Sequence, residues 1–245
     1  KVRGSMSREV VMQQPKQLSL RMLYQPAHLV FATRTLSLMW FDLIRLRARL
    51  KRIGQRNVVP PSSRLHVGCG NRRIKGWLNI DVIHSDYDVD LACGRLPWRS
   101  GVFDAVISQH VIEHLELVEE SLPLPRELHR VMKPNGELWL SCPDIEKVCR
   151  SYIEHGMLDL LQDRRRRDQH YSIADMPPQQ LINDLFHQYG QHKNLYDFRL
   201  LEWALTTVGF TSVERKTESD LLARFPEFPA RNDDQQSIYV CATVA

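Results

Sequence analysis

The segment Leu65-His66-Val67-Gly68-Cys69-Gly70-Asn71 decides the fold: a short apolar run leads into a turn that contains two glycines. Glycine adopts positive φ readily and lets a ligand approach the backbone closely. A Gly-x-Gly pattern alone is weak evidence for a ligand-binding turn, since any tight turn can contain it. Eleven residues after Gly70, however, Asp81 ends a second apolar run. A carboxylate at the tip of the second strand of a parallel sheet accepts hydrogen bonds from ribose hydroxyls. The turn and Asp81 together predict a nucleoside-binding α/β sheet.

The same turn argues against a nicotinamide dinucleotide. Arg73 holds the place of the third glycine in the Gly-x-Gly-x-x-Gly pattern. The spacing from the glycines to Asp81 is also well below the roughly 20 residues of the dinucleotide fingerprint. A ligand without a pyrophosphate does not need the full phosphate loop at a helix N-terminus.

Short apolar runs alternate with helical patterns from residue 64 onward, which is typical of a parallel α/β sheet. We predict strands at 64–67, 77–82, 89–91, 103–108, 137–142, 211–216 and 237–244. Helices are predicted at 111–117, 126–132, 144–155 and 196–208, the last one ended by Gly209. Residues 156–195 are polar and irregular, and too long for an ordinary connection. They are predicted to form a lid or a substrate-binding insertion.

A basic arm precedes this domain. Residues 1–5 resemble a cloning remnant ahead of Met6, so the arm is taken as 6–60 and the catalytic domain as 61–245. Up to Arg56 the chain carries twelve basic and two acidic residues, and after it 21 basic and 27 acidic residues. Residues 17–56 are predicted to be helical, with Pro60-Pro61 in the linker that follows. The helix is amphipathic and basic, so it serves as a lid over the domain or contacts a membrane surface or nucleic acid. The lid is the preferred interpretation.

Composition is that of an ordinary globular protein, with 43% hydrophobic and 25% charged residues among 245. No stretch after Met6 has a secretory pattern or the length of a membrane span. The five cysteines are scattered, without a Cys-x-x-Cys pair, so neither a zinc knuckle nor a disulfide framework is predicted. A reducing, cytoplasmic location is the expectation.

Six motifs, including the glycine turn and the Asp81 run, follow the order and spacing of a known family. They are His66-Val-Gly-Cys-Gly-Asn71, Gly76-Trp-Leu-Asn-Ile-Asp81, Leu96-Pro-Trp98, Phe103-Asp-Ala-Val-Ile-Ser108, His110-Val-Ile-Glu-His-Leu115 and Leu128-His-Arg-Val-Met-Lys-Pro-Asn-Gly136. Residues 64–142 thereby resemble class I S-adenosylmethionine-dependent methyltransferases, most closely the type 11 group that includes enzymes of glycan and natural-product clusters. The resemblance implies a Rossmann-like, seven-stranded sheet, mostly parallel with the last strand antiparallel, a helical N-terminal arm and a lid insertion after the fifth strand.

The resemblance also implies the cofactor contacts. The methionine part of S-adenosylmethionine would be lined by Gly68, Cys69 and Gly70. After methyl transfer the cofactor would be released as S-adenosylhomocysteine. Asp81 would hold the ribose and Val82 would lie beside the adenine. The segment of Asp90, Leu91 and Ala92 would border the adenine ring, with one backbone or carboxylate group reaching its amino group. Ser108, Gln109 and His110, at the end of the fourth strand, would face the methionine portion, on the side from which the acceptor approaches.

Two positions depart from the family. His66 stands where many relatives carry an acidic residue, so backbone carbonyls would contact the methionine amino group instead. Asn135 replaces a glycine in the turn before the fifth strand, which asparagine tolerates.

Methyl transfer from a sulfonium is an in-line displacement, so positioning of the nucleophile is central, and a hydroxyl acceptor also needs a base. Histidine is suited to that role near neutral pH. We predict His192 as base or acceptor-binding residue, then His187, with His110 third because it follows the fourth strand. A structural role for His192 and His187 is an equal alternative. Glu113-His114 is interpreted as a structural helix start, and no metal site is predicted.

The acceptor itself stays open. A small molecule, such as a saccharide or secondary metabolite methylated on oxygen, is preferred over RNA or protein, because no catalytic Asn/Asp-Pro-Pro-Tyr/Phe signature is present. A cofactor-binding, non-catalytic partner subunit is the third hypothesis. The run Arg164–Arg167 is interpreted as a solvated turn, with a phosphate or carboxylate clamp or a nucleic-acid contact as alternatives.

Overall fold

The structure is a computed structural model that describes residues 31–245, apart from the side chains of Thr33, Arg34, Ser37 and Tyr189. The proposed cloning remnant at residues 1–5 and the first part of the arm, up to residue 30, lie outside the described residues. The described residues form two parts, 31–43 and 44–245, with helix α2 (Thr33–Lys51) running through the boundary. No helix in residues 31–245 combines the length and apolarity that crossing a membrane requires.

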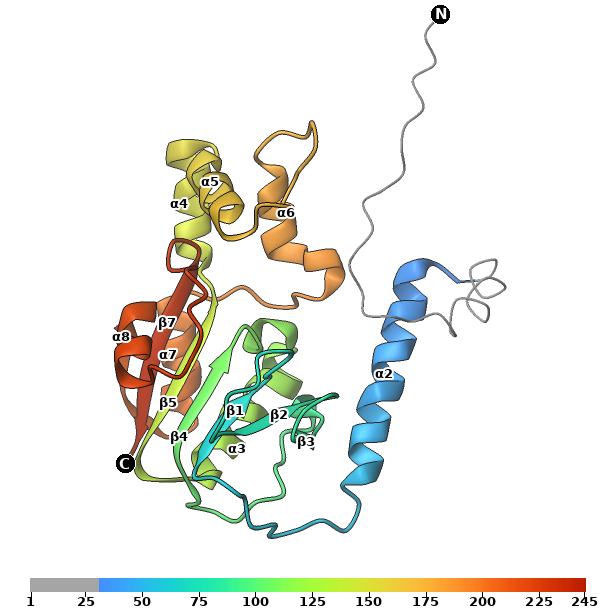
Figure 1. The fold of residues 1–245 in the computed structure, drawn as a ribbon, viewed down its shortest axis with the longest axis vertical. Helices are drawn as coiled ribbons and strands as arrows, with labels where there is room; N and C mark the ends of the chain where they lie inside the picture. Colours follow the sequence, from blue (N-terminus) through green and yellow to red (C-terminus); the bar gives the residue numbers. More distant parts are fainter. Residues whose placement is uncertain (1–30) are drawn as a thin grey trace, which may run out of the picture. The chain divides into compact units, whose positions relative to one another are not determined.

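A seven-stranded sheet forms the centre of the second part (Figure 1). Its strands are β1 (Arg64–Val67), β2 (Leu78–Asp81), β3 (Tyr87–Asp88), β4 (Phe103–Gln109), β5 (Met132–Pro143), β6 (Phe210–Lys216) and β7 (Ser237–Val244). Their order is β3-β2-β1-β4-β5-β7-β6, with β7 antiparallel to both of its neighbours and the other pairs parallel. The predicted Rossmann-like sheet, mostly parallel with an antiparallel last strand, is confirmed.

Two apolar clusters cover the two faces of the sheet. Successive side chains of a strand point to opposite faces, so in β4 Val106 belongs to one cluster and Ala105 and Ile107 to the other. The first cluster includes residues of α3 (Pro123–Val131) and α7 (Phe198–Thr207), and the second includes residues of α8 (Glu218–Arg224). Burial on both faces explains why the central strands β4 and β7 read as nearly continuous apolar runs, whereas the edge strand β6 is mostly polar and exposed.

The third strand was predicted too late in the sequence. The prediction placed it at 89–91, but β3 is Tyr87–Asp88 and residues Leu91–Cys93 form a single 3₁₀ turn. Asp90 caps that turn, since its carboxylate accepts a hydrogen bond from the Ala92 N–H at 3.1 Å. A local side-chain bond of this kind competes with strand pairing, which the apolar pattern alone does not reveal.

The helix predicted at 111–117 and 126–132 is also corrected. Residues Ile112–His114 form a 3₁₀ turn, Leu117–Ser121 one π-helical turn, and α3 begins at Pro123. Prolines 123 and 125 therefore lie in the first turn of a helix, where a missing N–H costs nothing, and do not interrupt one.

The insertion at 156–195 is not irregular. It contains α5 (Leu158–Arg167) and α6 (Gln180–His187), which follow α4 (Ile145–His155). Buried residues of these helices, such as Val148, Leu161 and Leu181, form a third apolar cluster. Figure 1 shows α4, α5 and α6 together beyond the end of β5. The many charged residues of α5 concealed its helical pattern.

Candidate active site

The glycine turn and Asp81 meet at the ends of β1 and β2. One carboxylate oxygen of Asp81 accepts the Gly70 N–H at 2.8 Å, and the other accepts the Val82 N–H at 2.6 Å. Gly68 and Gly70 have positive φ values of 68° and 51°. A Cβ on Gly70 would meet no atom within 4 Å, so the turn borders open space. The residues predicted to hold the ribose and the methionine part are thus brought together.

The Asp90 carboxylate, by contrast, is already engaged. It lies 3.1 Å from Arg45 Nε and 2.5 Å from Arg49 Nε, both on the last turns of α2, and is almost fully buried. Arg45 also contacts Glu120 at 2.8 Å. Both oxygens of the Asp90 carboxylate therefore have partners, and the Ala92 N–H and the Asp90 carbonyl are bonded within the turn as well.

Ser108, Gln109 and His110 mark the end of β4. Ser108 and Gln109 are buried, while His110 adopts a left-handed backbone conformation with φ 57°. Such a conformation is sparsely populated by residues other than glycine and persists where surrounding contacts enforce it. Here those contacts come from the His110 side chain.

Two carboxylates hold the His110 ring. Its Nε2 lies 2.8 Å from Asp233 Oδ2 and its Nδ1 lies 3.1 Å from Glu113 Oε1. Burial opposes a charged ring, but the bonds to Asp233 and Glu113 outweigh it and raise the pKa of His110 above its usual value. Burial likewise opposes charge on Asp233, yet His110, Tyr239 and Arg231 hold the pKa of Asp233 far below its usual range. Both contacts therefore favour the protonated form of the His110 ring.

Glu113 connects this pair to a second histidine cluster. Its side chain is 1% exposed and, apart from the 3.1 Å ion pair with His110 Nδ1, its carboxylate oxygens have no hydrogen-bond partner among the described residues. Ligand atoms of Glu113, His114 and His192 lie within 4.8 Å of one another. The His114 and His192 rings are 4.8 Å apart, and their Nδ1 atoms donate to the carbonyls of Gln191 and Leu185 at 3.3 and 2.5 Å.

These carbonyl contacts fix the tautomer of both rings, so each Nε2 has a free lone pair. Two imidazoles and the buried Glu113 carboxylate, which His110 Nδ1 approaches at 3.1 Å, are a donor set of the kind that divalent metals accept. Burial, the largest effect, also lowers the pKa of His192, which keeps its ring neutral near pH 7. The sequence analysis assigned Glu113-His114 only a structural role and did not foresee this cluster.

His187, the second predicted base, is separate from the cluster. It ends α6, is exposed, and its side chain makes no hydrogen bond or ion pair within residues 31–245. Its backbone carbonyl accepts the His192 N–H at 3.3 Å. Of the three predicted histidines, the structure brings His110 and His192 to Glu113 and leaves His187 outside.

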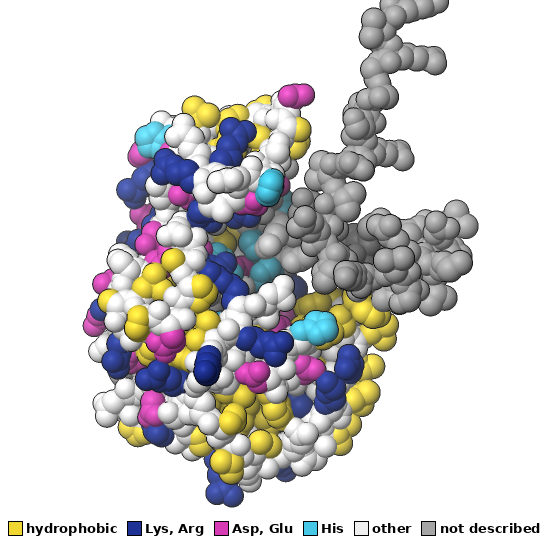
Figure 2. All heavy atoms as spheres, in the orientation of Figure 1, with side chains coloured by type: hydrophobic (Ala, Val, Ile, Leu, Met, Phe, Trp, Pro, Cys, Tyr) yellow, Lys and Arg dark blue, Asp and Glu magenta, His cyan; other side chains and the backbone are white. Residues whose placement is uncertain are grey.

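A hollow of about 670 Å³ adjoins the His110 pair, and we refer to it as the arginine hollow. Its charged lining residues are Arg72, Arg164, Arg166, Arg167, Arg231, Asp163, Asp168 and Asp233. Asp233 belongs both to this lining and to the His110 pair. Figure 2 shows dark blue Lys and Arg side chains, with cyan His side chains close to them, in the recess between the α4–α6 end and the sheet. Only the Arg164–Arg167 run was noticed in the sequence, and the predicted solvated turn is wrong because these arginines form the last turn of α5.

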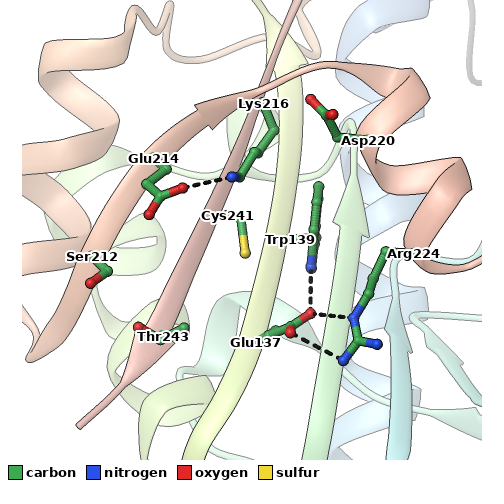
Figure 3. A pocket seen from close by; sticks show the side chains of 9 residues that line it. All are labelled: Glu137, Trp139, Ser212, Glu214, Lys216, Asp220, Arg224, Cys241 and Thr243. Atoms are coloured by element: carbon green, nitrogen blue, oxygen red, sulfur yellow. Dashed lines mark hydrogen bonds and ion pairs between the residues drawn. The ribbon is translucent and has the colours of Figure 1, made fainter.

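A second, smaller hollow of about 210 Å³ lies over β5, β6, β7 and α8 (Figure 3). Its charges pair with one another: Arg224 contacts Glu137 at 3.1 Å and Lys216 contacts Glu214 at 2.6 Å. No predicted site residue lines it. The functional site is therefore assigned to the end of the sheet that carries Asp81 and His110.

Comparisons with known proteins agree with this arrangement. Residues 87–140 match a family model described as a methyltransferase domain. No curated protein has significant sequence similarity to the chain.

Several solved structures are similar at low identity. A Thermotoga maritima S-adenosylmethionine-dependent methyltransferase, described as a possible histamine N-methyltransferase, is 12% identical (87% of this chain, 96% of that one, TM-score 0.44). A Haemonchus contortus phosphoethanolamine N-methyltransferase 2 is 14% identical (80% and 51%, TM-score 0.41), so this chain spans about half its length. A putative Haloferax volcanii methyltransferase in complex with the activator Trm112 is 12% identical (82% and 89%, TM-score 0.41). These weak similarities say nothing about the acceptor.

The family match covers the strands and turns from β3 to β5, beside the glycine turn and Asp81. Residues 87–140 thus match a methyltransferase domain family, and they lie in a sheet with the strand order β3-β2-β1-β4-β5-β7-β6.

Proposed function

We propose that the chain transfers a methyl group from S-adenosylmethionine to a hydroxyl oxygen of a small molecule, a saccharide or a secondary metabolite. The observation that carries the methyl-donor site is the bond between the Gly70 N–H and Asp81, with open space beside the turn. When bound, the cofactor supplies an electrophilic methyl group on a sulfonium. The chain's own task is to orient the acceptor and to remove its proton.

The donor would lie along the ends of β1, β2 and β4. Asp81 would accept the ribose hydroxyls, since a carboxylate has about four lone-pair positions and two are used by Gly70 and Val82. Gly68 and Cys69 would border the methionine part, as would Ser108 and Gln109. For the adenine amino group we favour the backbone of residues 90–92, because Arg45 and Arg49 occupy the Asp90 carboxylate.

His192 is the proposed general base. Its Nδ1 donates to the Leu185 carbonyl, which leaves the Nε2 lone pair free to accept a proton, and its lowered pKa favours the neutral ring. His110 is a weaker candidate because both of its ring nitrogens face carboxylates and its pKa is raised. We assign His110 and Asp233 to orienting the wall of the acceptor site. His187 has no contact that would position it for proton transfer.

The setting of this activity is proposed to be glycan or natural-product biosynthesis in a reducing, cytoplasmic compartment. All five cysteines are free, which suits a compartment that keeps thiols reduced.

The test is transfer of a labelled methyl group to a panel of hydroxylated saccharides and aromatic metabolites, with matched amines, RNA and protein alongside. We expect product from hydroxyl acceptors, and a drop in kcat of about 10²–10⁴-fold for His192→Gln, as for loss of a general base. Exposed His187→Gln is the matched control and should keep its rate. Methylation of amines, RNA or protein alone, or equal rates for both variants, would contradict the proposal.

A further inference from the structure

The arginine hollow carries more positive charge than its own carboxylates neutralise. Arg167 pairs with Asp163 at 2.9 Å, and Arg231 pairs with Asp233 at 3.2 Å. Asp233 also contacts His110 Nε2 at 2.8 Å, so its carboxylate is shared between two partners. Among the described residues, Arg72, Arg164 and Arg166 make no ion pair with any carboxylate in the hollow. Three guanidinium groups thus lack an ion-paired carboxylate, and Asp168 is the one lining aspartate without an ion pair among the described residues, so the hollow has an excess of positive charge.

Arg72 is held firmly in this unfavourable position. Its guanidinium donates to the carbonyls of Pro229 and Ala230 at 3.2 and 3.1 Å. Burial and the nearby charge of Arg231 lower the pKa of Arg72 from its usual value. Two cations kept close together in a partly buried wall are a cost to the fold that a bound anion would relieve.

On the α5 side of the hollow, Arg164 and Arg166 also lack an ion-paired carboxylate. The Arg164 guanidinium lies over the Tyr171 ring at 5.2 Å, which restrains it, and its Nε is buried without a hydrogen-bond partner. Arg166 is exposed and makes no hydrogen bond or ion pair with residues 31–245. A guanidinium presents parallel N–H donors that match the oxygens of a phosphate.

The hollow also lies next to the residues of the predicted cofactor site. Arg72 follows Gly70 of the cofactor turn by two positions, and Asp233 binds both Arg231 and His110. In a sheet of this kind ligands bind beyond the carboxyl ends of the parallel strands, where the ends of β1 and β4 place these residues. An anion in the hollow would therefore belong to the molecule that approaches the methyl group.

We propose that the arginine hollow binds a phosphate group on the methyl acceptor, so that the enzyme methylates a phosphorylated small molecule. This inference rests on the proposed function and narrows its acceptor class. Arg72, Arg164 and Arg166 supply the free cationic donors, and Asp233 links the phosphate site to His110. A small molecule is favoured over RNA because the cations are gathered in one hollow that also contains three aspartates, which would repel a long polyanion.

The first arm of the test measures binding without any methyl transfer. The whole chain is titrated calorimetrically with glucose 6-phosphate, inorganic phosphate and glucose. We expect both phosphate probes to bind, with affinity that falls as salt is added, and glucose to bind at least about tenfold more weakly than its phosphate.

Variants on α5 identify the site. Arg164→Gln combined with Arg166→Gln removes two lining cations and should weaken glucose 6-phosphate binding at least about tenfold. Arg165→Gln is the matched control, since Arg165 is exposed in the same run but does not line the hollow. It should change binding less than about twofold. Unchanged circular dichroism and S-adenosylhomocysteine binding would show that each variant is folded.

Several results would overturn the inference: no phosphate binding by the wild-type chain, equal weakening in Arg165→Gln, or tight binding of poly(U) RNA that phosphate does not compete. S-adenosylhomocysteine is titrated into the same samples. If S-adenosylhomocysteine binds and phosphate does not, the phosphate-site inference fails and the proposed methyl transfer is unaffected. If phosphate binds and S-adenosylhomocysteine does not, the proposed methyl transfer fails while the anion site stands.

Discussion

Gly68→Ala tests whether the first glycine of the turn is required for backbone and packing reasons. At φ 68° an alanine costs roughly 1–2 kcal/mol of backbone strain. Its Cβ would also lie 2.0 Å from Val111 Cγ2, a buried side chain that must move. Forcing an extra carbon into a packed core costs about 1–3 kcal/mol. The variant should therefore lose about 2–5 kcal/mol of unfolding free energy.

Gly70→Ala is the matched control for this prediction. Gly70 has a similar φ of 51°, but nothing lies within 4 Å of the added Cβ, so only the strain of roughly 1–2 kcal/mol applies. Urea unfolding measures both variants. Combining Gly68→Ala with Val111→Ala removes the clashing methyl and should recover about 1–3 kcal/mol of coupling in a double-mutant cycle. Equal losses for the two glycine variants, or no coupling to Val111, would refute the steric argument.

The remaining predictions concern pH and ion pairs. Burial lowers the pKa of His66 to about 4. As the pH falls, the unfolded chain therefore protonates at His66 before the folded chain does. The free energy of unfolding should decrease between pH 6.5 and 4, and the loss should reach about 2 kcal/mol at pH 5. Urea midpoints across this range measure it, and an unchanged slope in His66→Gln would contradict it. For His110 the pH dependence has the opposite sign, because its pKa is raised in the folded state. Its protonation stabilises the fold below about pH 6.5, and this contribution is lost as the pH rises through the folded-state pKa. The loss should be absent in His110→Gln, and a variant whose unfolding free energy falls equally with rising pH would disprove this. Arg45→Ala should cost about 2–3 kcal/mol in urea, because Arg45 is 16% exposed and bridges Asp90 and Glu120, whereas half-exposed Arg49→Ala should cost under about 1 kcal/mol. Similar losses for both arginines would be inconsistent with that difference in burial.

The central strands β1, β4 and β7 were predictable because they are largely buried and read as apolar runs. β1, β4 and β7 begin within a residue of their predicted starts. The errors arose where a local interaction outweighs the pattern, as at the Asp90 cap or at Pro123, which begins α3. The charged sequence of α5 has no clear apolar stripe, so its helix was missed.

The site was predictable only in the part that local sequence encodes. Gly70 and Asp81 stand eleven residues apart on consecutive strands, and their contact follows from the strand-turn pattern. The contacts of His110 with Asp233 and of Glu113 with His192 join distant segments. Asp233 lies in the polar run Arg231-Asn-Asp-Asp-Gln-Gln236, which carries no signal in a single sequence.

The most direct test of the central claim is calorimetric titration with S-adenosylhomocysteine of the wild-type chain, Asp81→Asn and Asp104→Asn. Asp104 is an exposed carboxylate at the opposite end of β4, paired with Lys133, and serves as the control. The account predicts micromolar binding by the wild type and by Asp104→Asn, and at least about tenfold weaker binding by Asp81→Asn. A folded wild-type chain that does not bind, or an Asp81→Asn variant that binds as tightly as the control, would contradict it.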